Sequence, residues 1–70
     1  MKKEYLLHLQ YDVWSSQCWF LGDDSPEAEA RWLEARKALP EIAETVSNPQ
    51  LFSQMVAEHF KAYGFDRVHK

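Results

Sequence analysis

Few residues in this chain have side chains suited to catalysis or metal binding, and they are far apart in sequence. There is one cysteine, Cys18, and there are three histidines, His8, His59 and His69. A reactive thiolate needs a neighbouring cation or a helix N-terminus, and no basic residue adjoins Cys18 in the sequence. We therefore expect Cys18 to be a small buried apolar residue. One cysteine and three scattered histidines predict no metal site.

His59 lies beside apolar positions of a predicted helix, which leaves two interpretations of its role. A general base would need a nucleophile and an orienting group, and the sequence supplies no recognisable set. The alternative is a partly buried histidine whose ring nitrogen bonds to a backbone or carboxylate oxygen, and this is what we expect. Asp23 and Asp24 could hold a hard cation, but paired carboxylates before a helix commonly complement its dipole.

Nucleotide chemistry through a glycine-rich loop is excluded because Gly22 and Gly64, the two glycines, stand alone. A chain of 70 residues with one core also has few residues left to wall a pocket that excludes water. The sequence therefore predicts a protein that is not an enzyme and that binds no cofactor.

The N-terminal segment has the period-two pattern of a β-strand. From residue 4 to residue 13, one face is apolar and the other polar, with Leu6 as the exception on the polar face. The predicted core face comprises Tyr5, Leu7, Leu9, Tyr11 and Val13. Ser15-Ser16 is the predicted turn to a second strand at residues 17–21, so we expect a β-hairpin.

Helical signals dominate the rest of the chain. Ser25 followed by Pro26 predicts a helix start, and the predicted buried stripe of this helix comprises Ala28, Trp32, Ala35 and Leu39. Pro40 should end or kink that helix, and a short second helix should follow at residues 41–46. Its buried side should comprise Ile42, Ala43 and Val46.

A third helix is predicted from the cap-and-proline pair Asn48-Pro49 to about Tyr63, with Gly64 ending it. Its broad apolar face comprises Leu51, Phe52, Met55, Val56, Phe60 and Tyr63. Residues 65–69 fit either a short edge strand or a frayed tail. The prediction is a single α+β domain over residues 1–70: an N-terminal antiparallel hairpin packed against two to three helices.

Composition and charge narrow the expected partners and location. The chain is 46% hydrophobic and carries a formal net charge of −3, which favours a folded domain and argues against a dedicated nucleic-acid binder. No uninterrupted apolar stretch has the length of a signal peptide or a membrane span. With a single cysteine, the expectation is a cytoplasmic protein without membrane contact.

Several residues have no evident place in the core and are predicted to bind another protein. Strand alternation puts Trp14 opposite the core face, although a small twisted sheet could instead fold it over an edge into the core. Leu33 points away from its helix's buried stripe, and seven acidic against three basic residues occupy positions 23–44. The predicted protein-binding residues are Trp14, Trp19, Asp23, Asp24, Glu27, Leu33 and Glu34.

Three functional hypotheses follow. The first is a non-catalytic inhibitor or regulator that occupies a surface of a larger protein, a profile shared by analogy with small acidic inhibitors from phages and mobile elements. The second is a self-associating subunit that completes its core across a two-fold axis, through the helix face at residues 51–63. The third is a nucleic-acid role, either acidic mimicry or weak binding through Lys2, Lys3, Lys61, Arg67 and Lys70.

Overall fold

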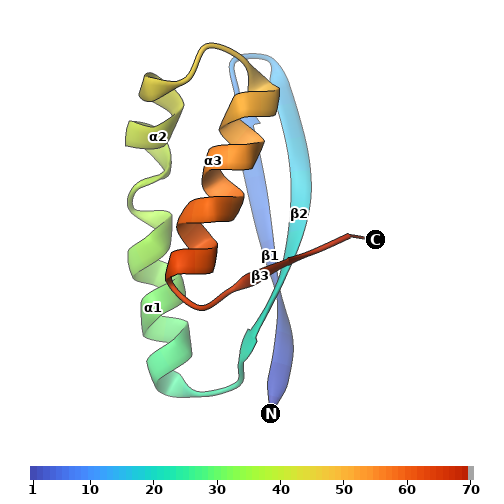
Figure 1. Cartoon of the computed structure of the whole chain (residues 1–70), viewed down its shortest axis with the longest axis vertical. Coiled ribbons are helices and arrows are strands. Elements are labelled where there is room, and N and C mark those ends of the chain that lie inside the picture. The colour runs from blue at the N-terminus through green and yellow to red at the C-terminus, as the bar shows by residue number, and fades with distance from the viewer. Residues whose placement is uncertain (70) are drawn as a thin grey trace.

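The chain folds into a three-stranded antiparallel sheet with three helices packed against it (Figure 1). The structure is a computed structural model, and it describes residues 1–69. The predicted α+β class is confirmed. In chain order the elements are β1 (Lys2–Tyr11), β2 (Trp14–Asp23), α1 (Pro26–Arg36), α2 (Leu39–Thr45), α3 (Pro49–Ala62) and β3 (Asp66–Val68).

The hairpin turn lies earlier in the chain than its sequence suggests. β1 and β2 pair along their whole lengths, and Asp12 and Val13 form the two-residue turn between them. The predicted turn at Ser15-Ser16 is wrong, because both serines lie inside β2. Asp12 has a φ of 54°, a left-handed conformation that aspartate tolerates better than most residues because its short polar side chain bonds locally.

The true turn position changes the face on which Trp14 lies. Trp14 pairs with Tyr11, and directly opposed residues share one face of a sheet. Trp14 is therefore on the helix-covered face, where it packs partly buried against the core. Its placement on the other face is wrong, and the alternative, that Trp14 joins the core, agrees with the structure. Val13, predicted for the core face, is 96% exposed at the turn.

α1 begins as predicted and ends earlier. The Ser25 hydroxyl oxygen accepts a hydrogen bond from the backbone N–H of Ala28 at 3.1 Å, and the predicted stripe is buried apart from Leu39, which is partly buried. The helix stops at Arg36, and α2 starts at Leu39 with Pro40 in its first turn. There the missing proline N–H costs no helical hydrogen bond.

α3 is capped by Asn48, whose side-chain oxygen accepts from the Leu51 N–H at 2.9 Å. Its apolar face divides into a buried part and an exposed part. Phe52, Val56 and Phe60 are buried within the chain, whereas Leu51 and Met55 remain 42% and 44% exposed. The buried part is covered by the chain's own core, and self-association through the exposed part of this face stays a prediction.

The C-terminal segment closes the core. After Gly64, whose φ is +95°, Phe65 is fully buried against the rings of Tyr5 and Trp32. β3 then pairs with residues 19–21 of β2, so the edge-strand interpretation is confirmed. All three helices lie on one side of the sheet (Figure 1), and the other side carries no helix.

Candidate functional site

The sheet surface that no helix covers is here called the open face. Side chains alternate between the two faces of a strand, so the buried odd residues of β1 and even residues of β2 face the helices. Their neighbours, together with two residues of β3, form the open face. It comprises Lys2, Glu4, Leu6, His8, Gln10, Ser15, Gln17, Trp19, Leu21, Asp23, Asp66 and Val68.

Three apolar side chains cross the middle of the open face in a line. Trp19 of β2 pairs with Leu6 of β1 on one side and with Val68 of β3 on the other. Leu6 is 38% exposed, and Trp19 and Val68 are partly exposed. Leu6, Trp19 and Val68, which we call the apolar row, thus form one continuous apolar strip across all three strands.

The two sides of the apolar row differ chemically. On one side Leu21 is paired with Glu4 and with Asp66, so two carboxylates flank an apolar side chain. On the other side His8 is paired with Gln17, and their side-chain nitrogens lie 3.1 Å apart. Beyond Glu4 and Leu21, Lys2 is paired with Asp23. The open face thus carries three carboxylates and one ammonium on one side of the row, and polar side chains without carboxylates on the other.

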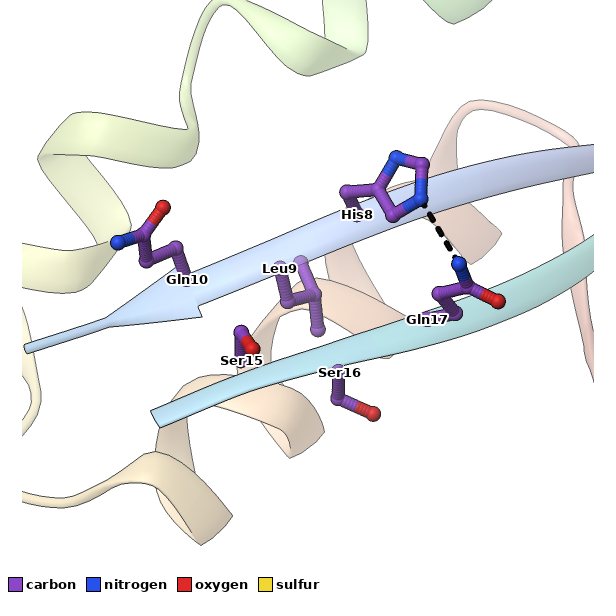
Figure 2. A pocket seen from close by; sticks show the side chains of 6 residues that line it. All are labelled: His8, Leu9, Gln10, Ser15, Ser16 and Gln17. Carbon is purple, nitrogen blue, oxygen red and sulfur yellow. Dashed lines mark hydrogen bonds between the residues drawn. The ribbon is translucent and has the colours of Figure 1, made fainter. Parts of the chain in front are cut away.

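A shallow hollow near the hairpin end adjoins this polar side. Figure 2 shows His8 of β1 and Gln17 of β2 directed toward each other across the strands. The hollow is lined by His8, Leu9, Gln10, Ser15, Ser16 and Gln17. A catalytic imidazole is normally bonded to its nucleophile and to an orienting carboxylate, whereas this ring is bonded to an amide, which suits polar recognition.

No known protein family, curated protein or solved structure matches this chain. Within residues 1–69, no helix is both long and apolar enough to cross a membrane. The same residues contain no group of three or more histidine, cysteine or acidic side chains placed to hold a metal ion. The geometry of the open face is therefore the main guide to function.

The predicted acidic residues at the start of α1 are engaged within the chain. The N-terminal ammonium lies 3.6 Å from Asp23, and Lys3 lies 3.8 Å from Asp24 and 2.6 Å from Glu29. The hydrogen bond to Glu29 raises the pKa of Lys3. A hydrogen bond from Ser25, aided by the N-terminal ammonium, lowers the pKa of Asp23. These charges tie the N-terminus of β1 to the β2–α1 connection.

Apart from Asp23, which lies at one end of the open face, the other predicted binding residues do not join Trp19 there. Glu27, Leu33 and Glu34 lie on the exposed side of α1, where Leu33 is 57% exposed and Glu34 is 3.1 Å from Lys37. Trp14 lies on the helix-covered face. Of the seven predicted residues, the structure places Trp19 alone in the apolar row, and the binding role of the others stays a prediction.

Sequence reasoning missed the two partners of Trp19 in this row. Leu6 had a usable signal, since it is the one apolar residue on the polar face of the first strand. Val68 gave no such signal in the sequence, because its position on the sheet depends on how β3 pairs with β2.

Cys18 and His59 have the structural roles expected of them. Cys18 is buried in the core. The His59 Nε2 atom lies 3.0 Å from the Ala35 carbonyl oxygen, and its ring packs against Phe60 and Tyr63. The histidine thus links α3 to the end of α1.

Proposed function

We propose that this protein is a non-catalytic binding module that inhibits or regulates a larger protein by laying its open face on it. The apolar row carries the proposal. A sheet packed on one side usually presents polar side chains to water on the other, and here Leu6, Trp19 and Val68 depart from that pattern in a single line.

The composition of the row is that of an interface centre. Interface residues whose truncation costs most binding energy are enriched in tryptophan and lie near the middle of the contact, surrounded by groups that exclude water. Trp19 lies on the central strand, with an aliphatic residue on each side across the strands and with Gln17 and Leu21 as its neighbours on the same face of β2. This arrangement supports Trp19 as the residue that contributes most to binding, and Leu6 and Val68 as the neighbours that exclude water from it.

The flanks of the row indicate the chemistry of the partner. Glu4 and Asp66 give one side negative charge, and complementary charge at the rim of an interface speeds and orients association. The partner should therefore present an apolar protrusion with lysine or arginine on one side of it. Its other side should offer groups that hydrogen-bond to His8 and Gln17.

The test compares Trp19→Ala with Val13→Ala, a control that truncates an exposed apolar side chain at the hairpin turn, outside the apolar row. A partner captured by the wild-type protein is identified and purified, and dissociation constants are measured for all three proteins by calorimetry. Loss of the Trp19 side chain should weaken binding by about 2 kcal/mol or more, whereas the control should bind like the wild type.

Circular dichroism of each variant checks that it is folded, so that a change in the dissociation constant cannot be caused by unfolding. A folded Trp19→Ala protein that binds its partner as tightly as the wild type would remove the open face as the site. Retention on nucleic acid at low salt, lost as salt rises, would instead favour a phosphate-binding role.

A further inference from the structure

The outer edge of β1 is a long strand edge without a partner among the described residues. The sheet order is β1-β2-β3, so β1 pairs with β2 on one side only, along all ten of its residues. An edge of this kind presents a row of backbone N–H and C=O groups that a further strand can pair with. β1 lies behind the helices in the view of Figure 1.

The hydrogen-bond pattern shows which residues of β1 face outward. The Asp24 N–H donates to the Met1 carbonyl oxygen at 2.8 Å, and hydrogen-bonded residues alternate along an antiparallel ladder. The odd residues of β1 therefore bond to β2, and the even residues direct their backbone groups to the outer edge of the sheet. The even residues are also those whose side chains lie on the open face.

We propose that two copies of this chain associate by antiparallel pairing of their β1 edges about a two-fold axis at Leu6. Leu6 of each copy then lies opposite Leu6 of the other. The two three-stranded sheets become one continuous sheet, and the two apolar rows join end to end across the axis. The exposed Leu6 side chain is covered in the process.

The side chains favour this register over its nearest competitor. With Leu6 on the axis, Glu4 lies opposite His8 of the second copy, and Lys2 lies opposite Gln10. A carboxylate thus meets an imidazole twice by symmetry, and no two like charges are opposed. The register with Leu7 on the axis gives the same overlap but sets Leu6 opposite His8, which breaks the apolar row.

The opposite edge of the sheet explains why pairing should stop at two copies. β3 is three residues long and covers only residues 19–21 of β2, so that edge is stepped and offers no second long strand. A two-fold contact between β1 edges uses the same surface on both copies and closes. A dimer rather than a fibre is the expected product.

Dimer formation and the proposed binding function share Leu6, but they have different central residues. Dimer formation depends on backbone groups of β1 and on Leu6, whereas partner binding is centred on Trp19. Trp19→Ala should therefore weaken partner binding and leave the dimer intact. If the dimer forms and no partner binds, only the binding proposal fails; if a partner binds a monomer, only the dimer proposal fails.

The first experiment measures oligomeric state by sedimentation velocity at micromolar concentration for wild type, Leu6→Lys and Leu33→Lys. The first variant sets two ammonium groups against each other on the axis, and the control adds the same charge to another exposed leucine. The expected result is a dimer for wild type and Leu33→Lys and a monomer for Leu6→Lys. A monomeric wild type, or a dimer that survives Leu6→Lys, would overturn the proposal.

The second experiment tests the register by oxidative cross-linking of Leu6→Cys and His8→Cys proteins. Hydrogen-bonded opposite residues have Cα atoms about 5.5 Å apart, within the range for a disulfide. The two His8 positions would be four residues out of step, about 13 Å apart. The buried Cys18 should not compete. Leu6→Cys should give a covalent dimer and His8→Cys should not; the reverse result would overturn the register and the axis.

Discussion

Gly22 lies directly against the ring of Phe65 in the core. An added Cβ atom there would lie 2.3 Å from Cδ1 and 2.5 Å from Cε1 of the Phe65 ring. Because the Phe65 ring is itself fully buried, it has no room to move away. Glycine is needed at this position to let the ring approach the backbone of β2.

Gly22→Ala should consequently lower the free energy of unfolding by about 1–3 kcal/mol, the usual cost of overpacking a core. Urea denaturation followed by tryptophan fluorescence measures the change. Ser15→Ala is the matched control, since it adds no volume at an exposed position of the same strand. Equal stability of Gly22→Ala and wild type would show that Phe65 does not pack as described.

The lowered pKa of Asp23 predicts how the stability of the fold depends on pH. This pKa is lowered chiefly by a hydrogen bond from Ser25, so the unfolded chain binds this proton more readily than the folded one. The associated stabilisation is present above the ordinary pKa of aspartate and is lost as the pH falls through the folded value.

Ser25→Ala should raise the pKa of Asp23 toward its ordinary value because the main favourable hydrogen bond is removed. An NMR titration of the Asp23 carboxyl carbon gives the midpoint directly. Asn48→Ala is the control, since it removes the cap of α3 and should leave the midpoint unchanged. An unchanged midpoint in Ser25→Ala would assign the shift to the N-terminal ammonium instead.

Among the elements, the helices could be predicted from local sequence and the hairpin turn could not. The Ser25-Pro26 and Asn48-Pro49 pairs fix two helix starts through side-chain caps and proline geometry, which are properties of adjacent residues. The hairpin register is decided by pairing over ten residues of each strand. Asp12-Val13 carries no glycine, so the turn gives little local signal.

The hairpin turn therefore stores some backbone strain that a substitution should release. Asp12 has a φ of 54° and is the only described residue other than glycine at positive φ. Asp12→Gly should raise the free energy of unfolding by up to about 1 kcal/mol, because glycine adopts this conformation without a Cβ clash. Asp12→Ala should lower it. Thermal unfolding of the three proteins gives the order, and a less stable Asp12→Gly would mean that the aspartate side chain contributes more than the strain costs.

At the scale of the whole molecule, the core is largely predictable from the sequence and the open face is not. The alternation of β1 and the stripes of α1 and α3 are local patterns, and they identify most of the residues that are buried. The apolar row joins residues 6, 19 and 68, which become neighbours only through the pairing of three strands. Sequence distance hides such a surface, since each of its members looks ordinary in its own segment.

The last residue before β3 should decide whether the chain folds as one unit. Phe65 is fully buried and contacts the rings of Tyr5 in β1 and Trp32 in α1, so it joins both ends of the chain to the first helix. Phe65→Ala should cost about 3–5 kcal/mol, a large part of the roughly 5–15 kcal/mol that stabilises a typical domain.

The control is Val13→Ala, which truncates a side chain that is 96% exposed and should change little. Urea unfolding of both variants, followed by far-ultraviolet circular dichroism and by tryptophan fluorescence, shows whether the two signals change together. If Phe65 closes a single core, its loss shifts both transitions to the same lower midpoint. A shift in fluorescence alone would mean that the hairpin and helices are stable without the C-terminal segment. The apolar row needs Val68 beside Trp19, so it would then be the first part of the molecule to unfold.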